Sequence, residues 1–423
     1  MEYCLVFNIN LLHYFGIWPS EDTRKPWKKA AYRMVSIFLL LQLILFYITE
    51  LAGFYMNWGD IRKMTEAMCQ ITANTHLICK ISYLLFNHKR FHKLLQSLNN
   101  ISSHYPGIKN NNNLVFVKNC ESVIKGFTFA YIGAGWLVGI FWVISPLIDN
   151  ESGHSELPFH SWTPFNVSDP VLYSVMYTLH VMHASLFSTY IPSCSMFIFG
   201  LICHASARFK ILHSLLLQSE ISMESDKRMD KKEHEHKGLE LYNYAFPEVE
   251  VKGNRKDTNN YKNLLNEELT TLQECIIYHQ SILRFCKELE EILSPIMFME
   301  IITTGIALCV VAFQVTEVPV YSLRFFTMAT FLISVLFECG IFFWAGEQLI
   351  TESLKTADII YGCMQWYHNC SLFSRGIPII IACSQSEVKL TCGKFYILSL
   401  SNYANVIKTS YSFYAVLKSL HDS

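Results

Sequence analysis

Charged residues are scarce in this chain. They make up 16% of its 423 residues, against about 25% in an ordinary soluble domain, while 51% of the residues are hydrophobic. Such a composition leaves more apolar surface than one water-exposed domain can bury. The scarcity of charge therefore excludes an ordinary soluble domain and predicts a membrane protein with lipid around it.

A basic surplus is also missing, since the formal net charge is -1. Nucleic-acid binding requires clustered Lys and Arg on one face, so no nucleic acid is expected as a partner. The N-terminal segment lacks the leading positive charges and the cleavage site of a signal peptide. Residues 3–18 are therefore predicted to form an interfacial helix, with a cleaved leader as the alternative.

Catalytic and metal-binding patterns are not evident either. No nucleophile, base and oxyanion donor recur at a recognisable spacing, so we expect no enzyme and no cofactor. His234 and His236 form a weak metal signal, because they lack Cys partners, and no metal is expected. No internal repeat is found, which disfavours a membrane transporter, although that alternative stays open.

Long apolar segments are what the chain does contain. A bilayer core of about 30 Å needs roughly 20 mostly apolar residues in a helix. Clear spans cover residues 34–55, 123–148, 171–203, 292–316 and 325–345, and two more polar ones cover 64–86 and 395–417. The expected fold is an all-α membrane protein with seven transmembrane helices. The two polar spans are expected to face protein or water rather than lipid.

Lys and Arg are distributed unevenly between the loops. Of the 34, 28 fall on the side of the N-terminus and four on the other side, while the connection at 149–170 has none. Positive residues in short loops are held in the cytoplasm. This asymmetry predicts an inverted topology, with the N-terminus cytoplasmic and the C-terminus extracellular, opposite to a G-protein-coupled receptor. No external disulfide is expected, and the sequon at Asn166 lies in an outer loop.

Three of the predicted spans continue as helices below the membrane. Helical periodicity continues in residues 208–217, 264–293 and 345–367. These continuations leave amphipathic stripes that fit a subunit interface. The charged stretch between the first two, residues 219–262, is predicted to be a mobile loop. The predicted parts are the N-terminal segment 1–33, helices one to four in 34–203, cytoplasmic extensions in 204–291, helices five and six in 292–345, a helical cytoplasmic anchor in 346–392, helix seven in 393–418 and a tail at 419–423.

The last span has its polar residues in one stripe. The residues that recur at steps of three or four, and that are predicted to line a pore, are Leu398, Asn402, Asn405, Thr409 and Ser412. Several copies around an axis would form a hydrated path with Leu398 as an apolar collar. A buried helix whose polar groups bond to its neighbours is equally compatible with this spacing. Lys408 in the same span would oppose cation conduction if it faced the path in every subunit.

The C-terminal third resembles the signature of insect odorant receptors. The matching residues are Gly346, Glu352, Ser353, Tyr361 and Trp366 at the base of helix six, and Gly393, Phe395, Ser410, Tyr411 and Ser412 in helix seven. The resemblance extends to the span count, the inverted topology and the long cytoplasmic helices. A gustatory receptor shares this architecture, but its usual Thr-Tyr and Gln-Phe elements are not evident here.

The resemblance implies a ligand-gated, non-selective cation channel in which four subunits each contribute a seventh helix to the pore. Most members are tuning subunits that assemble with one shared co-receptor in the plasma membrane of olfactory sensory neuron dendrites. Asn402, where the co-receptor has a second apolar pore residue, and Lys408 imply a tuning subunit in a heterotetramer.

The resemblance also places the ligand in the outer half of the membrane, between helices two, three, four and six. Translated by depth, the candidate contacts are Thr72, Thr75, Gly135, Val138, Trp142, Tyr173, Met176, Tyr177, His180, Phe326, Thr330 and Phe331. These residues suit a small, largely apolar volatile such as an ester, alcohol, aldehyde or terpenoid. Helix packing is the alternative role for each aromatic, and a structural hydrogen bond is expected for Glu300 and Glu338.

Overall fold

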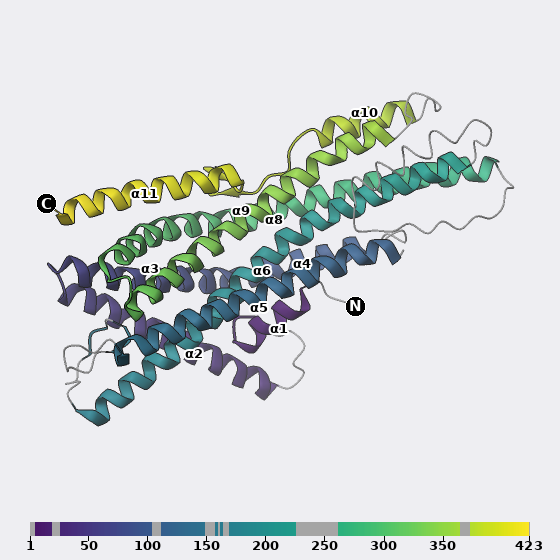
Figure 1. The fold of residues 1–423 in the computed structure, drawn as a ribbon. Coiled ribbons are helices and arrows are strands. Elements are labelled where there is room, and N and C mark those ends of the chain that lie inside the picture. Colours follow the sequence, from purple (N-terminus) through teal and green to yellow (C-terminus); the bar gives the residue numbers. More distant parts are fainter. Residues whose placement is uncertain are drawn as a thin grey trace.

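The computed structural model describes residues 5–18, 26–103, 111–148, 157–159, 161–163, 169–225, 261–363 and 373–422. In this part of the chain the elements are α1 (Val6–Tyr14), α2 (Pro26–Met56), α3 (Ile61–Phe86), α4 (His88–Ser103), α5 (Asn111–Ile148), α6 (Pro170–Ser225), α8 (Tyr261–Glu317), α9 (Leu323–Cys363), α10 (Phe373–Ser384), β1 (Thr391–Cys392), β2 (Tyr396–Ile397) and α11 (Leu400–Asp422). The helices form one elongated bundle, in which α11 lies along α8 and α9 (Figure 1).

Six of the seven predicted spans fall within one of these helices, and the seventh overlaps most of α11. Among the described residues, five helices are long and apolar enough to cross a membrane, namely α2, α5, α6, α8 and α9. The remaining two, α3 and α11, have 26 and 23 residues and so reach about 39 and 35 Å, enough to cross a bilayer core of about 30 Å. Their lower hydropathy reflects polar side chains, which in α3 are largely buried against other helices.

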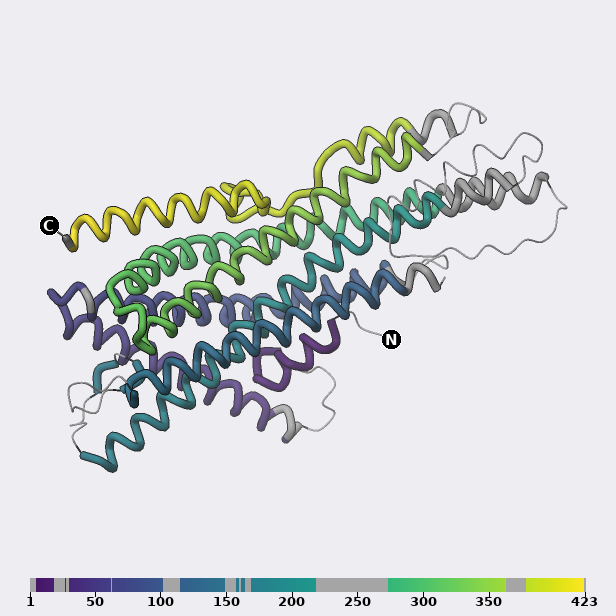
Figure 2. Tube along the Cα trace, viewed as in Figure 1, coloured from purple at the N-terminus to yellow at the C-terminus, as the bar shows by residue number. Residues whose placement is uncertain are grey.

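Three helices are far longer than a membrane requires. α6 and α8 have 56 and 57 residues and α9 has 41, so α6 alone extends roughly 84 Å. Their traces run together through the bundle and beyond its spanning part (Figure 2). The helical periodicity predicted beyond spans four, five and six is therefore present as helix in the described residues, which end at Cys363 in the third case. Residues 226–260, which include His234, His236 and most of the predicted mobile loop, lie outside the described residues, as does Asn166.

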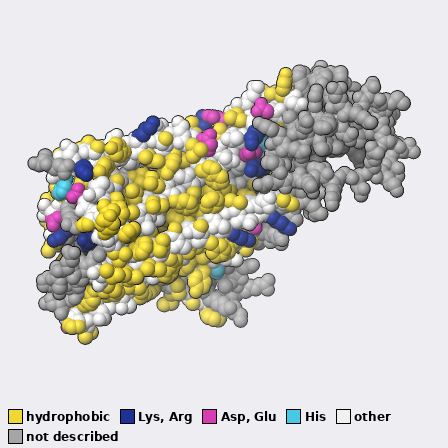
Figure 3. Space-filling model, in the orientation of Figure 1, with side chains coloured by type: hydrophobic (Ala, Val, Ile, Leu, Met, Phe, Trp, Pro, Cys, Tyr) yellow, Lys and Arg dark blue, Asp and Glu magenta, His cyan; other side chains and the backbone are white. Residues whose placement is uncertain are grey.

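The surface has the banded character of a membrane protein. Hydrophobic side chains cover the middle of the face seen in Figure 3, while charged side chains gather towards the ends of that band. Large apolar residues of α2 such as Ile37, Phe38 and Leu45 are more than half exposed. Lipid is the solvent in which such a surface is stable.

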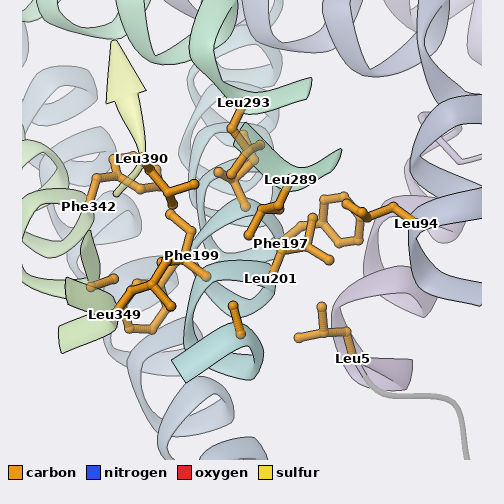
Figure 4. Packing of buried hydrophobic residues seen from close by; sticks show 14 of the residues in the cluster. Leu5, Leu94, Phe197, Phe199, Leu201, Leu289, Leu293, Phe342, Leu349 and Leu390 are labelled. Atoms are coloured by element: carbon orange, nitrogen blue, oxygen red, sulfur yellow. The ribbon is translucent and has the colours of Figure 1, made fainter. Parts of the chain in front are cut away.

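The main hydrophobic core lies where the long helices pass from the spans into their continuations. It joins Phe197 and Phe199 of α6, Leu289 and Leu293 of α8, and Leu349 of α9, as shown in Figure 4. The N-terminal helix α1 also docks here, because Leu12 is fully buried and Asn8 donates a hydrogen bond to Thr128 of α5 at 3.1 Å. The predicted helix at the N-terminus is present, packed on protein along one face.

The start of the seventh span differs from the prediction. Residues 391–397 form a short antiparallel hairpin in which Cys392 pairs with Tyr396, and α11 begins only at Leu400. The hairpin turns at Gly393 and Lys394, both with positive φ, and a β-carbon on Gly393 would collide with Phe298 of α8. The apolar residues and their helical spacing predicted a helix here, because a short apolar run does not distinguish a strand from a helix.

Candidate functional site

A largely apolar cavity of about 100 Å³ lies among α3, α5, α6, α8 and α9. Helix α2 contributes Glu50 to its wall, and the connection between α5 and α6 contributes Phe159. The volume is of the same order as the engineered cavity of about 150 Å³ that accepts benzene. The cavity therefore suits a small molecule with a few non-hydrogen atoms.

Aromatic rings form one wall of the cavity. Trp142 of α5 stacks on Phe159 with ring centroids 5.8 Å apart, and it meets Phe331 of α9 edge-on at 5.5 Å. His183 of α6 stacks on Phe46 of α2 at 3.7 Å. These contacts hold the rings in fixed orientations and offer apolar surface to a bound ligand.

Residues of the outer connection cover this wall. The Phe159 amide donates to His180 Nδ1 at 3.3 Å, and His180 Nε2 lies 3.1 Å from Ser161 Oγ, which fits a tautomer with the proton on Nε2. The Trp162 amide donates to the Thr49 carbonyl of α2 at 2.9 Å. His180 thus positions the covering segment through hydrogen bonds at both of its ring nitrogens.

A buried group of charged residues lies at the polar end of the cavity. The ammonium group of Lys80 on α3 is 2.8 Å from Glu300 on α8 and 2.6 Å from Glu338 on α9. Ser195 of α6 bonds to both Lys80 and Glu338. All four side chains are almost fully buried, so the group connects four helices through charge-assisted bonds.

His76 completes this group. Its Nδ1 lies 2.8 Å from Thr303 Oγ1, and its Nε2 lies 3.4 Å from both Glu300 and Glu338. One His and two carboxylates this close could hold a metal ion, since their ligand atoms lie within 4.8 Å of one another. The Lys80 ammonium already supplies a cation between the carboxylates, so we assign the group to ion pairing.

Five of the twelve predicted ligand contacts line the cavity. They are Thr72 of α3, Gly135, Val138 and Trp142 of α5, and Phe331 of α9. Gly135 has a further packing role, because a β-carbon there would collide with the Ser188 backbone of α6. The structure thus brings together predictions from three helices.

The other seven predicted contacts do not line it. Four of them lie on α6, namely Tyr173, Met176, Tyr177 and His180. The lining residues of that helix begin only at His183 and Ala184, further from its outer end. The membrane depth assumed for the contacts on this helix was therefore too shallow. Tyr177 instead donates to the Val143 carbonyl at 2.7 Å. The remaining three are Thr75, which bonds to Tyr47 at 2.9 Å, Phe326, which is 49% exposed, and Thr330, which bonds to the Phe326 carbonyl.

Several lining residues were not predicted. Glu50 of α2 and Phe159 of the outer connection come from parts of the chain without a candidate, and α8 contributes Thr303, Thr304 and Ala307. Glu50 carried a usable signal, because an acidic residue within a span is costly and commonly functional. Nothing in the spacing marked the three α8 residues.

The predicted pore residues divide into two groups. Leu398 precedes α11 and is only 1% exposed, with its amide bonded to the Leu390 carbonyl and its side chain against Gly346 of α9. Its prediction as part of a helical stripe is therefore wrong. Asn405, Thr409 and Ser412 are exposed on α11, and Asn402 is half-buried with its amide donating to the Ile397 carbonyl at 2.9 Å.

The exposed polar stripe of α11 is continuous. Asn405 bonds to Asn402 at 3.4 Å, and Thr409 and Ser412 donate to carbonyls one turn earlier in the helix. Lys408, beside Thr409, is exposed as well. A polar stripe is unstable against lipid tails, so this face requires water or other protein.

Known proteins resemble this chain over nearly its whole length. The family model described as 7tm Odorant receptor matches residues 60–411. Odorant receptor Or1 of Anopheles gambiae is 22% identical, with 97% of this chain and 93% of that protein covered, and the Odorant receptor coreceptor of Aedes aegypti is 20% identical, with 98% and 97% covered.

A solved structure shares the fold. The olfactory receptor OR5 of Machilis hrabei, determined in complex with eugenol, superposes with a TM-score of 0.77 at 12% identity and covers 98% of this chain and 97% of its own. The all-helical membrane fold and the expected absence of enzymatic activity agree with this likeness and with the family match. The chain belongs to the insect odorant receptor family, whose members are multi-pass, odorant-gated channels with an inverted topology.

Proposed function

We propose that this chain is a tuning subunit, which binds a small, largely apolar volatile and opens a non-selective cation channel together with the odorant receptor co-receptor. The observation that carries the proposal is the cavity between α3, α5, α6, α8 and α9, which has aromatic walls and a few polar groups. A relative of the same fold was solved with eugenol, which supports a small organic ligand for this fold. Esters, alcohols, aldehydes and terpenoids are candidate ligands.

The role of a tuning subunit is supported by α11. Lys408 is exposed next to the polar stripe, and four copies of a lysine around one path would repel cations. A mixed tetramer reduces that repulsion because the co-receptor contributes its own helices. Overall identity does not separate the two roles, since receptors and co-receptors both match at 19–24% over most of this chain.

The pore residues in this proposal are Asn402, Asn405, Thr409 and Ser412, without Leu398. Asn405, Thr409 and Ser412 are exposed on α11 and Asn402 is half-buried, and this exposure supports a water-facing role in the assembled channel. The proposed location is the plasma membrane of olfactory sensory neuron dendrites, where odorants are accessible.

Voltage-clamp recording tests the proposal. Three sets of cells are compared, which express this chain alone, the co-receptor alone, or both chains together. Each set is exposed to the same panel of volatiles. We expect odorant-evoked cation currents only when both chains are present. Currents from this chain alone would reject the mixed assembly, and silence of surface-localised complexes across the panel would reject the odorant-gated function.

A further inference from the structure

Glu50 is a buried acid in the cavity wall with half of its carboxyl group unsatisfied. Its side chain is fully buried, and Oε2 accepts a hydrogen bond from Asn74 Nδ2 at 2.7 Å. Oε1 has no hydrogen-bond partner among the described residues. A buried carboxyl oxygen without a partner costs free energy, so such groups commonly mark a place where a ligand or water binds.

The second acid of the cavity is in a different situation. Glu338 is neutralised by Lys80 at 2.6 Å and also bonds to Ser195. For Glu50, no basic group lies within ion-pairing distance in the part of the chain that the structure describes, and the nearby rings of Phe46 and Phe159 offer no polar partner. Within the cavity, Glu50 is thus the acid left to interact with a ligand.

The surroundings restrict what that ligand can be. The cavity is small, at about 100 Å³, and mostly apolar, with Trp142 and Phe331 among its walls. A ligand must therefore combine a compact hydrocarbon part with one polar group near Glu50. A hydroxyl group suits a carboxyl in either protonation state, because it can both donate and accept a hydrogen bond. Ethers, esters and ketones only accept, so they bond to Glu50 only when its Oε1 carries a proton, whereas a hydroxyl group bonds to Oε1 in both states.

We propose that Glu50, held by Asn74, selects odorants that carry a hydroxyl group, that is, small alcohols or phenols. This inference rests on the proposed function, since it takes the cavity to be the odorant site. Glu50 acts as a specificity-determining residue that binds the hydroxyl directly, while the aromatic walls bind the hydrocarbon part.

The test compares matched ligands on the complex of this chain with the co-receptor. The panel contains an alcohol, its methyl ether, the parent hydrocarbon and the corresponding primary amine, all on one small carbon skeleton. For the native chain we expect the alcohol to act at about a tenfold lower concentration than the ether, the effect of one buried hydrogen bond. This comparison needs no variant, so it does not depend on whether a substitution folds.

Two substitutions then assign the preference to Glu50. Glu50→Met is expected to remove the difference between alcohol and ether, whereas Glu50→Gln, which still donates and accepts, is expected to keep most of it. Asp60→Asn, which changes an exposed acid away from the cavity, serves as the control and should leave all responses unchanged. Surface labelling of each variant confirms equal expression.

Each other outcome overturns the inference in a recognisable way. Equal potency of alcohol and ether, with both responses abolished by the cavity-filling change Ala184→Phe, would refute the hydroxyl selectivity and leave the odorant site intact. Higher potency of the amine, lost in Glu50→Gln, would show a cation site instead. Silence of the native complex to every volatile would remove the proposed function, and the inference with it.

Discussion

The ammonium nitrogen of Lys80 lies 2.6 Å from a carboxylate oxygen of Glu338, and both side chains are buried inside the spanning part of the bundle. Glu300 lies 2.8 Å from the same ammonium group. The three residues come from α3, α9 and α8, so one lysine holds together three of the helices that surround the cavity. Desolvated charges of this kind are tolerated only while they remain paired.

Lys80→Met is therefore expected to destabilise the protein strongly. The substitution leaves two carboxylates without their cation, and breaking a buried pair costs about 3–5 kcal/mol. Thermal unfolding of the detergent-solubilised protein, followed by fluorescence-detected gel filtration, measures the effect. Neutralising the partners as well, in Lys80→Met with Glu300→Gln and Glu338→Gln, is expected to restore part of the lost stability.

Lys63→Met provides the matched control for that experiment. Lys63 pairs with Asp60 at 3.6 Å, and both side chains are about half exposed. An exposed pair contributes about 0–1 kcal/mol, so this variant should unfold close to the native protein. Equal losses for Lys63→Met and Lys80→Met would show that the buried group does not stabilise the bundle.

Gly346→Ala is expected to disturb the junction between α9 and the start of α11. A β-carbon at Gly346 would overlap the backbone and side chain of Leu398, and overpacking of this kind costs about 1–3 kcal/mol. Gly126→Ala is the control, because nothing lies within 4 Å of a β-carbon at that position. We expect lower thermal stability for the Gly346 variant alone, and a stable Gly346→Ala protein would contradict the close packing.

Two cysteines near the C-terminal end report on topology and burial. Cys383 of α10 is exposed, whereas Cys392 is buried in the hairpin. Burial, with Glu300 and Glu290 nearby, raises the pKa of the Cys392 thiol to about 12, so at pH 7–8 it carries almost no reactive thiolate. A maleimide should therefore react with Cys383 and leave Cys392 unmodified.

The labelling experiment uses a maleimide that does not cross membranes. Because α10 connects α9 to α11 on the cytoplasmic side, Cys383 should be labelled only after the plasma membrane is permeabilised, and in Cys383→Ser the label should disappear from the peptide that contains this position. Labelling of Cys383 on intact cells would contradict the orientation. Labelling of Cys392 in the folded protein would contradict its burial.

Cysteine scanning of α11 tests which face of the helix meets water in the channel. Asn405→Cys and Thr409→Cys place a thiol on the exposed polar stripe, whereas Ser410→Cys places it on the buried face. In complexes with the co-receptor, a charged thiol reagent should reduce the current through the two stripe variants by at least about half, because the modified side chain obstructs the path. The Ser410 variant should be unaffected, and the reverse pattern would place the pore elsewhere.

Much of the fold follows from hydropathy alone. Helices such as α2 and α5 are long, mostly apolar runs that have few alternatives to crossing a membrane. The polar character of α3 was informative as well, because Asn74, His76 and Lys80 form buried contacts with α2, α8 and α9. Polar residues within a span therefore predict that the span is buried among other helices.

The finer placement of side chains was less predictable. Leu398 shares the helical spacing of the α11 stripe, yet the hairpin that directly precedes it, at residues 391–397, changes the local backbone, and spacing alone does not reveal this hairpin. The cavity residues on α6 lie deeper than expected because relative helix depth depends on packing, including the close approach of Gly135 and Gly139 to Ser188. Such offsets arise from tertiary contacts between helices.

Filling the cavity tests most directly that odorants act there. Ala184→Phe places a ring in the cavity wall, while Val175→Phe adds the same ring to an outward position of α6 that is 53% exposed. Both are recorded with the co-receptor at matched surface expression, over a panel of volatiles and with an agonist that acts on the co-receptor. We expect Ala184→Phe to lose odorant-evoked current at least about tenfold while keeping the agonist-evoked current, and Val175→Phe to respond like the native chain. Undiminished odorant responses in Ala184→Phe would contradict the assignment of this cavity as the odorant site.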